Sequence, residues 1–278
     1  MINLALHSIA REFRLNESPD IFDSVTVSPS GKRFKFVRHI PVSDRWQDSK
    51  NILNDTQEIG TGEDPRAFLW YGVPCISTIV YSYEHGYYTR LFHTEFSKWF
   101  TLFPPKEVKP GKNWTPFTIG EDLYFIHEFT PFRVLKARPL NSKHDNFLFF
   151  DTVAEFPVPP VPSVDGYATL RGGSNGVIIK DSIIGFGHTN EFIGESRFEN
   201  IIHRPFLWEI KTGMEFKAVT YPSITSPFDG SYMIVDPTSL FIENNVLYLM
   251  TCETQYPWNV TRDQCGRICI YEVQNLLD

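Results

Sequence analysis

The chain has 278 residues, a formal net charge of −7 and a sequence pI near 5.6. It contains no basic run of Lys and Arg, so we expect no nucleic-acid partner. It contains no apolar run of membrane-spanning length, and polar residues interrupt its first 15 positions, unlike a signal peptide. Together these features predict a cytoplasmic protein without a membrane span. Aromatic residues make up 15% of the chain, and 20 Pro and 17 Gly are scattered along it, which favours many short strands joined by turns.

Short apolar runs bounded by turn residues predict strands throughout the chain. In chain order they cover residues 34–38, 76–83, 87–92, 123–127, 146–151, 176–179, 182–187, 205–209, 239–242, 246–251 and 267–273. Residues 4–13 are the only stretch considered for a helix. The expected fold class is all-β, with a single domain over residues 1–278.

A repeated unit underlies these strands. Each copy has a polar opening with Pro or Gly, an apolar strand, a turn and a second apolar strand. Periods of about 41, 49, 58 and 65 residues separate the openings, which is typical of four-stranded propeller blades with insertions. The pattern predicts a five-bladed β-propeller whose polar openings meet at a central channel, and a β-sandwich is the alternative. The openings are marked by Asp23, Asp64, Asn113, Arg171 and Asp236.

Charged and polar side chains in these openings form the candidate site. Charges that converge on one channel are unfavourable unless they pair or bind a ligand. One carboxylate among several cations suits a sugar beside a phosphate, because the carboxylate can handle a hydroxyl proton while the cations hold anionic oxygens. The candidates are Asp64, Arg66, Lys112, Asn113, Arg171 and His188.

Each candidate also has a plain structural explanation. Asp64 and Arg66 are consistent with a strand-start turn that carries an ordinary ion pair. Lys112-Asn113-Trp114 is consistent with a turn and a capping aromatic residue, and His188 with a hydrogen-bonded core histidine. Arg171 is consistent with a solvated side chain on a flexible loop. Their shared position in the repeat favours the functional interpretation.

The sequence gives little reason to expect a metal or a cofactor. Cys265 and Cys269 have the spacing C-x3-C with no His close by, which favours free thiols over a zinc site. The chain contains no D-x-D triplet for a metal-bridged nucleotide. We therefore expect neither a metal nor a cofactor.

Three short motifs resemble the family of β-1,2-mannoside phosphorylases and the related mannosyltransferases. They are Gly62-Glu63-Asp64-Pro65-Arg66, Lys112-Asn113-Trp114 and Arg171-Gly172-Gly173-Ser174, with Gly187-His188 further along the chain. The resemblance implies a five-bladed β-propeller with these motifs in its second to fourth blades. It departs from the family at Gly111, where an acidic residue commonly precedes Lys-Asn, and around residues 253–263.

The resemblance also implies roles for individual residues. Asp64 would be the general acid that reaches the glycosidic oxygen through a sugar hydroxyl. Lys112, Arg171 and His188 would form the cationic set around a phosphate. The further candidates for binding substrate are Arg38, Arg45, Arg66, Asn113 and Trp114.

Three classes of function stay open on the sequence. A hydrolase needs a second carboxylate, for which Asp23, Asp236 and Glu253 are weak candidates. A phosphorylase uses phosphate as its nucleophile, and a glycosyltransferase could use the same cations for its donor's phosphates. We favour a metal-independent glycosyltransferase that moves a mannose-like sugar, or a pentose such as xylose, from a phosphate-containing donor to a glycan acceptor. A phosphorylase or hydrolase, and a non-catalytic carbohydrate-binding propeller, are the alternatives.

Overall fold

The structure is a computed structural model that describes residues 1–14, 17–18, 20–40, 49–84, 86–140, 146–158, 161–163, 166–192, 201–213, 216–255 and 265–276. Arg45 lies outside these residues, so its predicted role in substrate binding stays a prediction. The described residues form strands and turns without a helix, which confirms the all-β expectation. Accordingly, they contain no helix long and apolar enough to cross a membrane.

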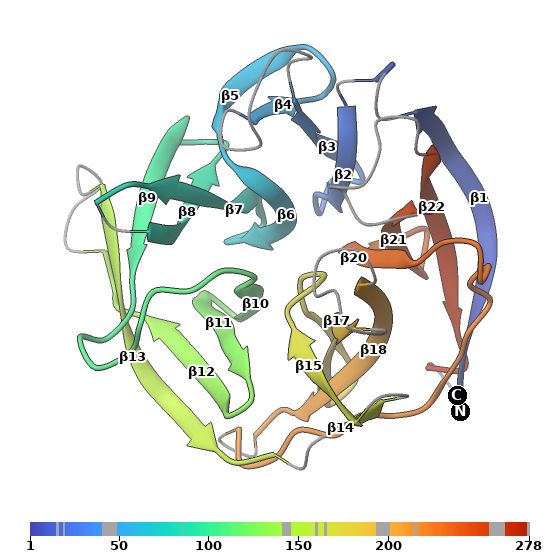
Figure 1. Ribbon diagram of the computed structural model, residues 1–278. Coiled ribbons are helices and arrows are strands. Elements are labelled where there is room, and N and C mark those ends of the chain that lie inside the picture. The colour runs from blue at the N-terminus through green and yellow to red at the C-terminus, as the bar shows by residue number, and fades with distance from the viewer. Residues whose placement is uncertain are drawn as a thin grey trace.

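Consecutive strands form antiparallel sheets that stand side by side around a common centre (Figure 1). The first sheet comprises β2 (Asp20–Val27), β3 (Arg33–His39), β4 (Lys50–Leu53) and β5 (Gln57–Thr61). The second comprises β6 (Glu63–Trp70), β7 (Val73–Ser82), β8 (Gly86–His93) and β9 (Lys98–Phe103). The third comprises β10 (Thr115–Ile119), β11 (Asp122–Phe129), β12 (Phe132–Ala137) and β13 (Phe147–Phe156). β13 also pairs parallel with β9, so the second and third antiparallel sheets are hydrogen-bonded into one sheet of eight strands.

The C-terminal half continues this arrangement. The next sheet comprises β15 (Gly166–Arg171), β17 (Ser182–Phe192) and β18 (Ile201–Lys211), with β14 (Val161–Ser163) beside β15 and β16 (Val177–Ile179) beside β17. The last sheet comprises β20 (Ile234–Glu243), β21 (Val246–Thr254), β22 (Cys265–Gln274) and β1 (Ile2–Arg14), with β19 (Ile224–Thr225) beside β1. β20 also pairs parallel with β18, so the last two antiparallel sheets are hydrogen-bonded into one sheet of ten strands.

Residues 4–13, the only stretch considered for a helix, are part of strand β1 instead. β1 pairs antiparallel with β22 from Asn3–Gln274 to Arg14–Cys265, so the start of the chain completes the sheet formed by its end (Figure 1). Leu4 and Phe13 are buried, whereas several positions between them are exposed. The backbone hydrogen bonds of this segment come from a partner 251 to 271 residues away in the chain, and such pairing overrides local propensity.

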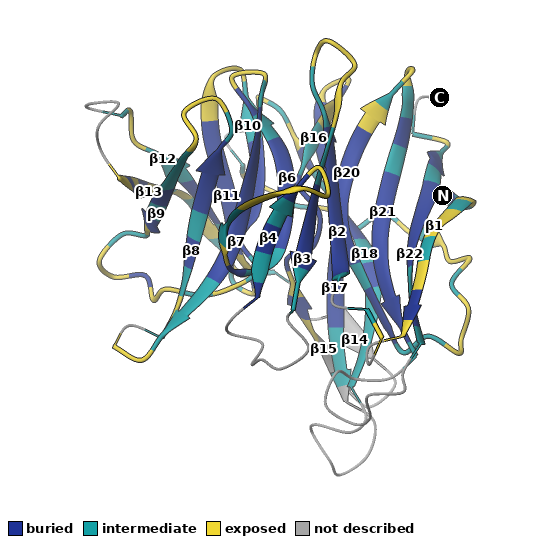
Figure 2. Ribbon diagram, turned by 90° about the horizontal axis from the view of Figure 1, so that it is seen from above, coloured by how far each residue is buried: buried dark blue, intermediate teal, exposed yellow. Residues whose placement is uncertain are grey.

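Apolar side chains pack in clusters between neighbouring sheets. Each cluster is shared by two sheets, so every sheet is held on both flanks and the ring of sheets is closed. Buried residues run along the strands, while exposed residues lie mainly in the connecting loops (Figure 2). The clusters include, from the two sheets that share each one, Phe36 and Ile76, Phe68 and Phe125, Phe117 and Trp208, Phe186 and Leu249, and Val25 and Met250.

The innermost strands are also joined by polar contacts. β6 lies against both β2 and β20 near the centre. Ser24 Oγ of β2 donates to the Thr238 carbonyl of β20 at 3.2 Å and accepts from the Ala67 amide of β6 at 2.7 Å. Strands fixed in this way bring their first residues to one end of the centre of the ring, where the candidate site lies.

Candidate active site

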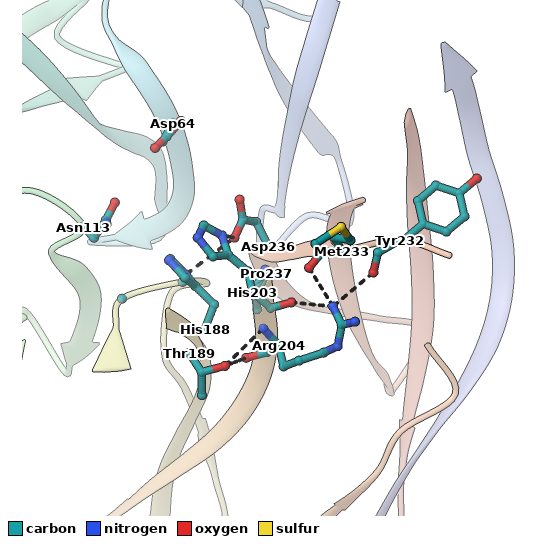
Figure 3. Close-up of polar contacts among 12 residues, drawn as sticks. Asp64, Asn113, His188, Thr189, His203, Arg204, Tyr232, Met233, Asp236 and Pro237 are labelled. Atoms are coloured by element: carbon teal, nitrogen blue, oxygen red, sulfur yellow. Dashed lines mark hydrogen bonds and ion pairs between the residues drawn. The ribbon is translucent and has the colours of Figure 1, made fainter. Parts of the chain in front are cut away.

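An irregular start of β6 sets the direction of Asp64. The pairing of β6 with β7 shifts register between Glu63 and Arg66, so Asp64 and Pro65 form a bulge in the ladder. Asp64 has φ 50°, a left-handed conformation that Asp tolerates better than most residues, and Pro65 has no N–H to leave unpaired. The side chain of Asp64 is 27% exposed and faces the centre of the ring (Figure 3).

Arg38 of β3 contacts the Asp64 carboxylate from the neighbouring sheet. Its Nη1 lies 2.8 Å from Asp64 Oδ1, and its Nη2 lies 3.8 Å from Glu63 Oε2. Burial raises the pKa of Glu63, Arg38 opposes the shift, and Asp64 adds to it. Arg38 is buried, so its contact with Asp64 is shielded from water. We therefore treat Arg38 as the group that positions the predicted catalytic acid.

Arg66 lies in the channel, but its hydrogen bonds go to the protein itself. The guanidinium donates to the Gly173 carbonyl, and to the carbonyls of Pro237 at 3.4 Å and Gly172 at 3.5 Å. It also donates to Asn113 Oδ1 at 3.2 Å. These acceptors belong to three other parts of the ring, and Arg66 is only 4% exposed. Burial lowers the pKa of Arg66, and Asp64 and Asp236 oppose this shift. We assign Arg66 to the framework of the channel rather than to the substrate.

Two glycines permit this close approach. A Cβ on Gly172 would overlap the Asn113 carbonyl oxygen, and a Cβ on Gly173 would overlap the Phe186 carbonyl oxygen. Asn113 itself has φ 66°, which Asn adopts more readily than most residues. The Gly-Gly pair is therefore a packing requirement, and it follows directly on Arg171, which ends β15 opposite His188 in the ladder.

Lys112 and Arg171 are the predicted cations with exposed side chains. Lys112 Nζ lies 4.9 Å from the centre of the Tyr87 ring, and its charge lowers the pKa of Glu63 against the effect of burial. The charge of Arg171 contributes to lowering the pKa of His188. The two cations thus act on different residues of the candidate site, Lys112 on Glu63 and Arg171 on His188.

A second polar cluster lies apart from Asp64 and Asn113 in the same region of the structure (Figure 3). His203 Nδ1 of β18 lies 2.7 Å from Asp236 Oδ1 of β20, and the His203 ring stacks on His188 of β17 at 4.5 Å. Burial lowers the pKa of His188 to about 3, so this histidine is neutral at neutral pH rather than cationic. Burial would raise the pKa of Asp236, but His203, His188 and Arg66 outweigh it and hold the value at about 2.

Arg204 fixes the position of His203. Its Nη1 donates to the carbonyls of His203 at 2.9 Å, Tyr232 at 3.0 Å and Met233 at 2.7 Å (Figure 3). The His203 amide also donates to the Met233 carbonyl at 3.0 Å. These bonds fasten β18 to the segment that leads into β20, which carries Asp236. Within the described part of the chain, His188, His203 and Asp236 are the group whose side-chain atoms lie close enough to hold a metal ion.

Trp114 is part of the core. The residue is 2% exposed and packs edge-on against Phe125 and Phe150. Its indole also contacts the ring of His127. A buried indole in an aromatic cluster contributes packing, so we leave Trp114 out of the proposed site.

Part of this site was not predicted from the sequence. Asp236 was considered only as a repeat marker and a weak second carboxylate, and His203 was not considered. The predicted strand began at residue 205, whereas β18 begins at Ile201. Extending that strand by four residues would have placed His203 in register with Asn190, two positions from His188 along β17.

No protein-family model matches the chain, and neither does any curated protein. Solved structures do match it. A glycosyl hydrolase from Bacteroides ovatus aligns with TM-score 0.60 and 11% identity, over 92% of this chain and 84% of its own. The chain has a propeller fold found in enzymes that act on glycosides.

Two further structures represent other activities on this fold. One belongs to the GH130 family of mannoside phosphorylases, which contains glycoside hydrolases that target β-1,2-mannosidic linkages in Candida mannan (TM-score 0.56, 12% identity, 92% of this chain and 84% of that one). The other is a GDP-Man-dependent mannosyltransferase from Leishmania mexicana (TM-score 0.56, 12% identity, 97% and 89%). At these identities the likeness concerns the fold.

Proposed function

We propose that the protein is a glycosyltransferase that moves a sugar from a phosphate-activated donor to a hydroxyl group of a glycan acceptor. One observation carries the proposal. Asp64, directed by the β6 bulge, pairs with Arg38 at 2.8 Å, and the predicted cations Lys112 and Arg171 have exposed side chains. The shared fold with carbohydrate-active enzymes, a GDP-Man-dependent mannosyltransferase among them, supports it.

The chemistry assigns each group one task. The acceptor oxygen attacks the anomeric carbon of the donor, and its proton passes to the Asp64 carboxylate. The bond between the anomeric carbon and the phosphate oxygen breaks, and the phosphate leaves with the electron pair. Lys112 and Arg171 stabilise the charge on the departing phosphate, so the transfer step itself needs no metal.

The surroundings of the other carboxylates favour a phosphate-activated donor over hydrolysis. A hydrolase of this type needs a second carboxylate that can activate water. Asp236 lies 2.7 Å from His203 Nδ1, and Glu63 lies beside Asp64 in the chain rather than across from it. A phosphorylase is the second candidate, because it runs the same transfer in reverse with phosphate as nucleophile and Asp64 as acid. The fold likeness to a mannoside phosphorylase family favours it.

The proposal also covers the number of blades, the donated sugar and the cellular location. The successive sheets would be five blades of one propeller over residues 1–278, closed by β1 on β22. The donated sugar would be mannose-like or a pentose such as xylose. The four cysteines are free, which is typical of a reducing compartment and supports a cytoplasmic location.

A donor screen tests this function. GDP-mannose, UDP-xylose and the corresponding sugar 1-phosphates are compared by thermal shift, followed by product analysis with the donor that stabilises the protein most. Arg171→Ala should weaken binding of that donor by about 2–3 kcal/mol, because a charge-assisted hydrogen bond to the phosphate is lost. Neutral acceptor sugars should bind almost unchanged, and Arg138→Ala, which removes an exposed surface cation, is the matched control.

The outcome separates the candidates. A transferase forms a glycoside from a nucleotide sugar or sugar phosphate, and free phosphate does not cleave that product efficiently. A phosphorylase gives phosphate-dependent cleavage to a sugar 1-phosphate. If no donor stabilises the protein and Arg171→Ala changes nothing, the carbohydrate-binding alternative takes the place of both.

A further inference from the structure

Two histidines and one aspartate meet at the wall of the channel. Their side chains come from three strands: His188 from β17, His203 from β18 and Asp236 from β20. Asp236 Oδ1 lies 2.7 Å from His203 Nδ1 and 3.7 Å from His188 Nδ1, and one ligand atom from each residue falls within 4.8 Å of the others. We propose that these three residues form a binding site for a divalent first-row metal ion, with zinc as the best-fitting probe.

The distances agree with the ligand geometry of such an ion. Zinc binds imidazole nitrogen and carboxylate oxygen at about 2.0–2.2 Å in a tetrahedral arrangement, which puts neighbouring ligand atoms about 3.3 Å apart. The observed separations of 2.7 and 3.7 Å lie on either side of that value, so small side-chain rotations reach it. Two imidazoles and one carboxylate are a donor set that suits first-row metals.

An independent observation concerns His188. The residue is 5% exposed, and its Nδ1 has no hydrogen-bond partner among the described residues. A buried polar atom without a partner is unfavourable, and this one is directed at Asp236. A metal ion would give the Nδ1 lone pair a partner at the point where the protein supplies none.

The cluster is held in place before any ion binds. Arg204 fastens His203 through three carbonyl groups, and the two rings stack at 4.5 Å with an angle of 30° between their planes. Ligands held by surrounding bonds lose little entropy on binding, which favours affinity. The side chains of His203 and Asp236 are 15% and 17% exposed, so water or a substrate oxygen can reach a fourth position on the ion.

The site goes beyond the proposed function, because no step of the transfer passes through it. It also departs from our expectation, based on sequence, that the chain binds no metal. An ion at this point would add a side-chain link between β17, β18 and β20, whose backbones already pair β17 with β18 and β18 with β20. Its expected effect is on stability. The positive charge of Arg66 acts on Asp236 and opposes a cation there, so zinc affinity is measured by direct titration.

The experiment uses the untagged full chain. The protein is stripped with EDTA, dialysed, and titrated with Zn²⁺ by calorimetry, with metal content read by mass spectrometry after desalting. We expect one equivalent of Zn²⁺ and a rise in Tm of about 3 °C or more. Co²⁺ should give the visible absorption bands of a tetrahedral site with nitrogen and oxygen ligands, a readout that needs no variant.

Variants locate the ion. His203→Gln and Asp236→Asn should each lower zinc affinity at least tenfold. His39→Gln is the matched control. His39 Nδ1 lies 2.6 Å from Asp20 Oδ1, and this His–Asp pair includes no second histidine in the described structure.

Absence of zinc binding to the folded chain, or equal zinc binding by His203→Gln, overturns the proposal. A rise in Tm caused by inorganic phosphate in the absence of zinc, and lost in His203→Gln, also overturns the proposal. It would assign the histidines to the donor site. None of these readouts depends on transferase activity, so failure of the metal site and failure of the proposed function are distinguishable.

Discussion

Replacing Arg66 should destabilise the protein far more than it changes substrate binding. The side chain is 4% exposed and donates to three backbone carbonyls and to Asn113 Oδ1. Arg66→Met leaves these acceptors without a donor and removes a positive charge that acts on Asp64 and Asp236. Each buried acceptor left unsatisfied costs about 1–3 kcal/mol, part of which is recovered as the site relaxes. Loss of one partner from a buried charged network costs about 3–5 kcal/mol in total, which is the magnitude we expect.

Urea unfolding followed by tryptophan fluorescence measures this loss, and thermal shift with the best donor measures binding. Arg138→Met is the control, because the Arg138–Asp151 pair is 58% and 57% exposed and should contribute less than about 1 kcal/mol. A folded Arg66→Met protein within about 1 kcal/mol of the parent, with donor binding abolished, would show that Arg66 is a substrate ligand and that our reasoning is wrong.

Two further predictions concern residues outside the proposed chemistry. Burial, followed by the charge of Arg133, lowers the pKa of His127 to about 4, whereas an unfolded histidine titrates near 6.5. The unfolded chain therefore binds the proton first, and this residue should cost about 2 kcal/mol of stability at pH 5 relative to pH 7. His127→Gln should show a correspondingly smaller loss of urea midpoint between these pH values, and an equal loss would contradict the assignment. Gly172→Ala should destabilise the protein by at least about 2 kcal/mol, because the new Cβ overlaps the Asn113 carbonyl oxygen. Gly230→Ala, where a Cβ meets nothing within 4 Å, should be within about 0.5 kcal/mol of the parent, and equal effects of the two changes would refute the close approach.

The strands were predictable from the sequence because their signals are local. Alternating and continuous apolar runs located β7, β8, β11 and β21 to within a few residues, since each run is bounded by turn residues. The partner of β1 could not be found in this way. Its pairing with β22 joins the two ends of the chain, and no local pattern encodes a contact over that separation.

The site was predictable in outline only. Repeat openings placed Asp64, Arg66 and Arg171 near one channel, but not the direction of their hydrogen bonds. Arg66 is turned inward by four acceptors, two of which are supplied by the backbone of Gly172 and Gly173. A sequence does not show which backbone carbonyls face the centre of the fold. An arginine that bonds to the protein itself and an arginine that binds substrate therefore look the same in the sequence.

The charge of His188 was likewise not predictable from the sequence alone. The sequence suggested a cation, whereas burial in the structure lowers its pKa to about 3. Its partners are His203 and Asp236, which lie on two other strands. The protonation state of a histidine depends on such tertiary neighbours, so it could be assigned only after the sheets had been placed.

The turnover of Asp64→Asn tests the central claim most directly. Asparagine keeps the size of the side chain but cannot accept the acceptor's proton, so kcat should fall at least about a hundredfold with the best donor. Donor binding by thermal shift and the urea midpoint should stay close to those of the parent protein. A folded Asp64→Asn protein that binds the donor and turns over at a near-normal rate would contradict the account.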